Sequence, residues 1–291
     1  MAMNHNEMRA ARVAVFEDTM AWIRENPALQ QAVNASIDGT RLLTGNIDYH
    51  SEENGRPFLT VTRERTLSCA ARLYQSNTNR DIAVLNFASA SHPGGGVARG
   101  ANAQEECLCR CSTLYPALRS QPAAPFYQLS RGNALHTDAC IYTPGVVAIK
   151  EDAALPTRME ENEFFTFDVI SCAAPNLRPH PGNAMNPGDI DPAHIADNDL
   201  FELHVRRWRQ ILRCAAGHAD TLVLGAFGCG AFRNPPQIVA GAFRELMNRD
   251  PLLLQSFYEI VFAVYCPPQN DTNFRVFDET LADVQCEEEF G

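Results

Sequence analysis

Four short apolar runs constrain the fold of this chain more than any other feature. They cover residues 82–87, 167–173, 221–226 and 259–266. The first of them is apolar at almost every successive position, as in a strand whose two faces are both covered. Helical periodicity recurs between the later runs, at Phe201, Val205, Trp208 and Leu212 and at Val239, Phe243 and Leu246. This alternation predicts an α/β fold with helices on both faces of a sheet.

The remainder of the chain fits one unit. Val13, Phe16, Met20 and Ile23 have helical spacing, and Asn26 is placed to cap a second helix that begins at Pro27. We expect a helical N-terminal segment at about 1–65 with one strand-like stretch at 58–61, a core at about 66–270 that opens on a short helix at 67–74, and a solvated acidic tail after 284. A chain of 291 residues without a repeat or linker predicts a single domain. Residues 175–198 lack periodicity and are predicted to form a long loop at the end of a strand.

Charge and cysteine usage exclude several classes. Against 24 Lys and Arg stand 35 Asp and Glu, a net charge of −11, so we expect no direct DNA binding. No apolar run reaches a membrane span, and the N-terminus lacks a secretion signal, which predicts a cytoplasmic protein without a membrane partner. The ten cysteines are scattered and expected to be reduced. Cys107, Cys109 and Cys111 lack the paired spacing of structural zinc sites, so no metal is expected.

A glycine-rich loop follows the first apolar run. The chain continues from Phe87 into Gly94-Gly95-Gly96 and then into a predicted helix. Consecutive glycines permit positive φ and let their amides point into one anion site. An ATPase-type phosphate loop would require a lysine, which is absent here. Arg99 lies in this loop. Two roles remain open for its side chain, contact with a phosphate or exposure to solvent, and exposure is the commoner case for a loop arginine.

A second loop of the same design follows the third apolar run. Gly225, Gly228 and Gly230 precede the helix-start signal Asn234-Pro235, and a dinucleotide fingerprint would need glycine where Arg233 stands. Either loop alone is compatible with a structural turn. Two such loops after buried strands favour a diphosphate ligand held by backbone amides and helix ends.

Two adjacent carboxylates, Glu105 and Glu106, open the helix after the first loop. Acidic residues are common in a first helical turn, so an exposed pair is the simplest interpretation. Neighbours on a helix point about 100° apart, so the two cannot flank one glycosidic bond as in ordinary glycosidases. A catalytic interpretation therefore needs one carboxyl acting alone as acid and base, with a diphosphate stabilising the transition state. A nucleophile pair of His92 and Cys107 lacks an orienting third group, which favours a buried thiol.

These residues resemble the signature of poly(ADP-ribose) glycohydrolases, a triple glycine followed by Gln-Glu-Glu. Residues 97–103 separate Gly94-Gly95-Gly96 from Gln104-Glu105-Glu106. The flanking Pro93, Arg110, Ser112, Leu114 and Tyr115, and the loop from Gly225 to Phe232, are similar to the compact microbial branch. The resemblance covers about residues 10–270. It implies a macrodomain-like α/β fold, a mixed β-sheet sandwiched between helices with an N-terminal helical extension, which binds ADP-ribose at the strand ends.

The resemblance also implies roles for individual residues. Glu106 is expected to be the catalytic acid and base, and Glu105 to hold the hydroxyls of the scissile ribose. Asn86 is expected near the ribose, although Ser89 stands where animal members carry asparagine and leaves that contact open. Other expected substrate contacts are Gly94, Gly95, Gly96, Val97, Gln104, Gly228, Cys229, Gly230 and Ala231. Either Phe227 or Phe232 is expected to pack on the adenosine or the terminal ribose, and no cofactor is implied.

The activity implied is hydrolysis of ribose–ribose O-glycosidic bonds in poly(ADP-ribose) with release of ADP-ribose. Two alternatives remain open. One is a hydrolase for a single ADP-ribose on a protein side chain such as arginine, selected by the loop at 175–198. The other is a non-catalytic ADP-ribose reader, which the intact Gln104-Glu105-Glu106 disfavours because a binder needs no carboxylate there. The expected partners are therefore ADP-ribose, its polymer or an ADP-ribosylated protein.

Overall fold

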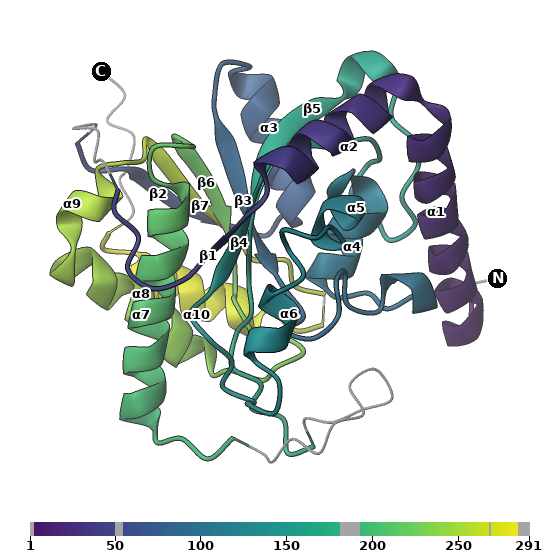
Figure 1. Cartoon of the computed structure of the whole chain (residues 1–291). Helices are drawn as coiled ribbons and strands as arrows, with labels where there is room; N and C mark the ends of the chain where they lie inside the picture. The colour runs from purple at the N-terminus through teal and green to yellow at the C-terminus, as the bar shows by residue number, and fades with distance from the viewer. Residues whose placement is uncertain (1–2, 50–54, 181–192, 268, 285–291) are drawn as a thin grey trace.

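A seven-stranded sheet crosses the molecule (Figure 1). The computed structural model describes residues 3–49, 55–180, 193–267 and 269–284. The strand bounds are β1 (Arg41–Leu43), β2 (Phe58–Thr62), β3 (Ile82–Phe87), β4 (Cys140–Ala148), β5 (Phe165–Cys172), β6 (Thr221–Leu224) and β7 (Glu259–Ala263). Their order is β1-β4-β5-β3-β6-β7-β2. The four predicted apolar runs all form strands, and these four, β5, β3, β6 and β7, are consecutive neighbours in the sheet.

The sheet is mixed, as expected. Strands β5, β3, β6, β7 and β2 run parallel to one another. Strands β4 and β1 are added antiparallel at one edge. Because the parallel strands all end at the same side, the loops that follow β3 and β6 emerge next to each other.

Helices cover both faces of the sheet, and the residues of β3 alternate between the two cores. Ala83 and Leu85 pack with α7 (Asp197–Ala215), α8 (Pro236–Arg249), α9 (Pro251–Leu254) and α10 (Thr272–Leu281). Ile82 and Val84 pack on the other face with α3 (Thr66–Ser76), α4 (Gln104–Cys111), α5 (Leu114–Leu118) and α6 (Phe126–Leu129). Two short 3₁₀ turns, Val97–Arg99 and Glu161–Glu163, complete the elements. The macrodomain-like α/β architecture is confirmed.

The predicted helical start of the chain is also confirmed. Helix α1 (His5–Glu25) ends at Asn26, and α2 (Pro27–Gly39) begins at the proline. The Asn26 side chain accepts the backbone N–H groups of Ala28 and Leu29, at 2.9 and 3.2 Å, so it caps α2. The two helices bend around the edge of the molecule that carries α4 and α5 (Figure 1).

Three expected boundaries require correction. The segment at 1–65 is helical only as far as Gly39: the strand expected at 58–61 is confirmed as β2, but β1 at the opposite edge of the sheet was not expected. The core extends past residue 270, since Phe277 and Leu281 of α10 are fully buried. Strand β7 ends at Ala263, so Cys266 lies outside the strand run that was expected to hold it. The acidic tail and residues 181–192 of the predicted long loop lie outside the described residues.

Strand β4 has no counterpart among the predicted runs. Pro144 and Gly145 interrupt its apolar pattern, and its register against β5 shifts between Thr143 and Val146. Gly145 adopts a φ of +62°, and its N–H donates to Asp168 at 2.9 Å. A bulge of this kind breaks the two-residue period from which strands are recognised.

Two further expectations concern cysteines and membranes. The nine cysteines in the described segments are all free, as predicted. Among the described residues no helix combines the length and the apolar character that a bilayer crossing requires.

Candidate active site

A cavity of about 690 Å³ opens where β3 and β6 end. Both glycine loops line it, so the structure brings the two sequence motifs together. The lining residues from the loops and from α4 include Ser89, Gly95, Gly96, Gln104, Glu105, Glu106, Cys107, Ala226, Gly228, Gly230, Ala231 and Phe232. The volume is in the range of sites that hold a small molecule.

The first glycine loop passes directly over the carboxylate pair. Gly94 and Gly95 have φ angles of +69° and +56°. A Cβ atom on Gly94 would lie 2.6 Å from the ring of Tyr115, and one on Gly95 would lie 2.4 Å from Oε1 of Glu106. Only glycine satisfies both the backbone conformation and the available space at these two positions.

Two backbone amides hold Glu106 in one orientation. Its Oε1 accepts the N–H of Gly96 at 2.9 Å, and its Oε2 accepts the N–H of Ala103 at 2.7 Å. The second bond caps the N-terminus of α4, in which Glu106 is the third residue. Glu106 is only 7% exposed, yet it lines the cavity. Each oxygen keeps a further lone pair for a reacting group.

Glu105 is held by different groups. Its Oε2 accepts the N–H of Ser89 at 2.8 Å, and the Asn86 amide nitrogen lies 3.5 Å from its Oε1. Burial raises the pKa of Glu105 well above its ordinary value, and the nearby Glu106 acts in the same direction. A protonated Glu105 offers a hydroxyl donor to the cavity.

We expect Glu105→Gln to stabilise the fold more at neutral pH than at about pH 4. Because the pKa of Glu105 is raised on folding, the folded chain binds more protons than the unfolded chain above the ordinary pKa. Stability therefore falls as pH rises through that window. Glutamine does not titrate and keeps an oxygen for the N–H of Ser89. Thermal unfolding from about pH 4 to pH 8 measures the difference, and a variant less stable than the wild type at every pH contradicts this assignment.

Asn86 and Gln104 both make hydrogen bonds within the protein, and only Gln104 lines the cavity. Asn86 is fully buried, donates to Ser171 Oγ at 3.0 Å and does not line the cavity, so its proximity to the ribose stays a prediction. Gln104 lines the cavity, but its side-chain amide forms hydrogen bonds with the backbone at the end of β3. Its Oε1 accepts the N–H of Phe87 at 2.9 Å, and its Nε2 donates to Leu85 O at 2.6 Å. These bonds fix the start of α4 against β3.

Asn234 clamps the second glycine loop. Its Nδ2 donates to Pro175 O at 2.7 Å and to Gly228 O at 3.1 Å, and its Oδ1 lies 2.9 Å from His204 Nε2. Gly228 has a φ of +75°, and a Cβ atom there would lie 2.5 Å from Ala174 Cβ. The loop is therefore rigidly supported from behind.

The cavity side of this loop carries backbone amides that bond to none of the described residues. The N–H groups of Gly228, Gly230, Ala231 and Phe232 donate to no other residue of the described segments. Neighbouring unpaired amides form an anion site of the type predicted from the sequence.

The choice between the two phenylalanines is decided by packing. Phe227 is fully buried against Trp208 and Phe87, with ring centroids 5.6 and 5.7 Å apart, and it does not line the cavity. Phe232 lines the cavity and packs on His136 at 5.7 Å. Three further expected contacts do not line the cavity, namely Gly94, Val97 and Cys229.

His136 is a lining residue that the sequence did not reveal. It has a φ of +59°, and its Nδ1 donates to Ala174 O at 2.7 Å. Burial lowers its pKa to about 4, so the imidazole is neutral near pH 7. The ring presents a neutral, partly aromatic wall beside Phe232.

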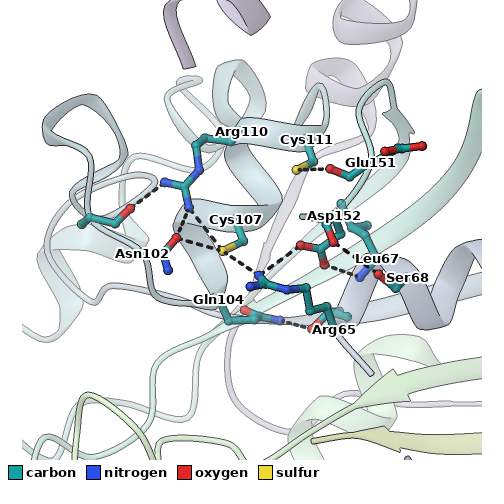
Figure 2. A network of polar contacts seen from close by, with 12 residues as sticks. Arg65, Leu67, Ser68, Asn102, Gln104, Cys107, Arg110, Cys111, Glu151 and Asp152 are labelled. Carbon is teal, nitrogen blue, oxygen red and sulfur yellow. Dashed lines mark hydrogen bonds and ion pairs between the residues drawn. The ribbon is translucent and has the colours of Figure 1, made fainter. Parts of the chain in front are cut away.

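Arg65, Asp152 and Tyr265 also line the cavity and also escaped prediction. Arg65 pairs with Asp152 at 3.5 Å and lies over the Tyr265 ring at 4.3 Å. Asp152 in turn accepts the N–H of Leu67 at 3.2 Å (Figure 2). These residues come from three separate parts of the chain, so no local sequence motif predicts them.

Arg110 braces the turn that precedes α4. Its guanidinium donates to Ala101 O at 2.5 Å, to Asn102 Oδ1 at 2.8 Å and to Cys107 Sγ at 3.2 Å (Figure 2). Burial raises the pKa of the Cys107 thiol. His92 is bonded instead to Ser91 Oγ at 3.0 Å. The two members of the imagined Cys–His pair are thus engaged by different neighbours.

Arg99 contributes nothing to the cavity wall, and Cys107 is the member of the three-cysteine run that lines it. Arg99 is exposed, does not line the cavity, and its carbonyl oxygen accepts Arg9 Nε at 2.6 Å. Within the described segments no three His, Cys, Asp or Glu side chains are grouped so as to hold a metal ion.

A fixed carboxylate beside two amide-rich loops, at the strand ends of a macrodomain-like sheet, defines a hydrolase of the glycosidase class. Comparison with known proteins identifies the family. Residues 18–151 match the family described as microbial-type PARG, catalytic domain. No curated protein matches the chain.

Solved structures extend the match over nearly the whole chain. The poly(ADP-ribose) glycohydrolase of Thermomonospora curvata is 30% identical with a TM-score of 0.79, covering 94% of this chain and 100% of that one. Its complex with the inhibitor ADP-HPD is 31% identical with a TM-score of 0.76, covering 93% and 99%. The Deinococcus radiodurans enzyme bound to ADP-ribose is 33% identical with a TM-score of 0.68, covering 87% and 98%. The chain belongs to the microbial-type poly(ADP-ribose) glycohydrolase family and is a glycosidase.

Proposed function

We propose that this protein hydrolyses the ribose–ribose O-glycosidic bonds of poly(ADP-ribose) and releases ADP-ribose, with Glu106 as the single acid and base. The observation that carries the proposal is the fixed orientation of Glu106. Its two oxygens are anchored at 2.9 and 2.7 Å by backbone amides in the wall of a cavity that also contains unpaired loop amides. Relatives of the family bind ADP-ribose and ADP-HPD in solved structures.

The reaction requires two proton transfers at one carboxyl group. Glu106 gives a proton to the departing 2′-oxygen as the bond between that oxygen and C1″ of the terminal ribose breaks. It then takes a proton from the water whose oxygen bonds to C1″. Positive charge develops on the ribose between these events, and the diphosphate held by the glycine loops stabilises it. Glu105, whose pKa is raised by burial, lies beside Glu106 in the cavity wall and forms a hydrogen bond with a hydroxyl of the same ribose.

Other lining residues provide surfaces for the two ends of the nucleotide sugar. Phe232, with His136 packed against it, offers an aromatic surface for the ribose beside Glu106. Tyr265 is half exposed, and with Arg65 over its ring it offers a stacking face for adenine. The Asp152 carboxylate is an acceptor near that face.

Purified polymer tests the proposal directly. We expect the protein to convert labelled poly(ADP-ribose) to monomeric ADP-ribose, measured by chromatography of the products. Arginine-linked ADP-ribosyl protein is the parallel substrate, and faster release from it assigns the site to single modifications. Binding of the polymer without any product contradicts the proposal and identifies a reader.

A further inference from the structure

A second cavity of about 450 Å³ lies on the outer side of α7. Arg206, Arg209 and Arg213 line it from one side, and residues 44–46 and 137–139 line it from the others. Leu129, which is 45% exposed, adds an apolar surface. We refer to this cavity as the α7 groove.

The α7 groove is positively charged on a chain of net charge −11. Positions 206, 209 and 213 follow the three-, four- and seven-residue spacing of one helix face, so the three guanidinium groups share one surface. Asp138 is the acidic side chain among the lining residues, and Arg206 lies 3.7 Å from it. Arg209 lies 3.4 Å from Asp250, and Arg213 donates to Asn46 Oδ1. The cations therefore exceed the anions at this surface.

Buried donors without partners lie beneath the arginines. Gln210 lines the α7 groove and is 6% exposed, and its Nε2 has no hydrogen-bond partner in the described part of the chain. The Nε atom of Arg213 is also buried and has no hydrogen-bond partner among the described residues. A buried donor left unpaired is unfavourable, and an acceptor oxygen entering the groove supplies what both atoms lack.

The α7 groove and the active-site cavity share one stretch of chain. His136 lines the active-site cavity, and the next three residues line the groove. Arg207 fixes this stretch, since its Nε donates to Asp138 at 2.7 Å and its Nη2 to Leu135 O at 3.4 Å. Arg207 also donates to Ala173 O at the end of β5. The two cavities are therefore lined by adjacent residues of one segment that Arg207 holds in place.

We propose that the α7 groove is a second nucleotide site that binds the diphosphate of an ADP-ribose unit. Arginine forks pair with phosphate oxygens in a bidentate manner, and the volume exceeds what one phosphate needs. The bound diphosphate belongs either to another unit of the polymer engaged at Glu106 or to free ADP-ribose. The choice of nucleotide rests on the proposed function, whereas the diphosphate chemistry rests on the groove itself.

Binding stoichiometry tests the groove independently of catalysis. In equilibrium dialysis with labelled ADP-ribose, we expect the double variant Arg206→Gln/Arg209→Gln to bind one nucleotide fewer per chain than the wild type. Gln210→Met is expected to do the same without lowering Tm, because it removes a buried unpaired amide. The matched control is Arg244→Gln/Arg249→Gln, which removes the same charge from exposed positions of α8. If the wild type binds one nucleotide per chain and the double variant binds none, the groove is the nucleotide site. That result overturns ADP-ribose binding at Glu106 and supports the groove proposal.

Kinetics identify the source of the diphosphate. For a polymer unit, the double variant raises KM for long poly(ADP-ribose) by about tenfold. Its KM for a single ADP-ribose carrying an aryl leaving group stays unchanged. For free ADP-ribose, stoichiometry falls and both KM values stay unchanged. Unchanged stoichiometry together with unchanged polymer KM overturns the proposal.

Discussion

Glu106→Gln is expected to lower kcat for poly(ADP-ribose) by about 10²–10⁴-fold, the usual contribution of a general acid and base. The amide oxygen of glutamine accepts one of the two N–H groups that now hold the carboxylate, those of Gly96 and Ala103. Its NH₂ group neither delivers nor takes a proton. ADP-ribose binding, measured by calorimetry, is expected to persist because the substitution leaves the cavity-facing amides of the second glycine loop unchanged.

The stability effect of the same substitution has a matched control. Glu7 occupies the third position of α1 and accepts the N–H of Asn4 at 2.8 Å, the same cap that Glu106 makes in α4. Glu7→Gln therefore measures the loss of a helix cap away from the cavity. We expect it to lower Tm slightly and to leave kcat intact. A Glu106→Gln enzyme that keeps more than about a tenth of wild-type kcat contradicts the assignment of Glu106.

The parts of the fold predicted from sequence are those governed by local chemistry. Asn26 and Pro27 specify a helix boundary through one side chain and one fixed φ angle. The run at 82–87 reads as a buried strand because both of its faces are apolar. Strand β4 was hidden because Pro144 and Gly145 break its period, and it is held by its register against β5. Pairing between distant segments leaves no such local signal.

The candidate site likewise contains some residues that local sequence predicts and others that only packing identifies. Gly94 and Gly95 predict a loop, because positive φ angles such as theirs exclude most other residues. Glu105 and Glu106 follow within the same segment of the chain. The loop after β6 contains two phenylalanines, and sequence does not rank them. Packing of Phe227 on Trp208, which lies on α7, leaves Phe232 to face the cavity.

The lining residues that sequence missed depend on tertiary structure entirely. Arg65, Asp152 and Tyr265 meet from segments that are distant in the chain, and each is unremarkable in its own local context. His136 is identifiable only by its position opposite Phe232 and by its bond to Ala174 O. A single sequence reveals local motifs. Contacts between distant segments become visible only in the folded structure.

Gly95→Ala is expected to lower kcat by about 10²-fold, the cost of displacing a catalytic group by about 1 Å. The new Cβ atom would lie 2.4 Å from Oε1 of Glu106 and 3.0 Å from Oε2 of Glu105, so both carboxylates must move. Moving Glu106 lengthens its bond to the N–H of Gly96. Alanine at a φ of +56° is also strained, which destabilises the fold by about 1 kcal/mol.

Gly217→Ala separates the loss of activity from the backbone strain. Gly217 has a φ of +78° in the turn after α7, and a Cβ atom there meets nothing within 4 Å. Both variants therefore carry the strain of an alanine at positive φ, while the Gly95 variant alone disturbs the carboxylates. We expect similar small decreases in Tm but a normal kcat for Gly217→Ala. Equal activity losses in the two variants would show that strain, and not the close approach of Gly95 to Glu106, controls turnover.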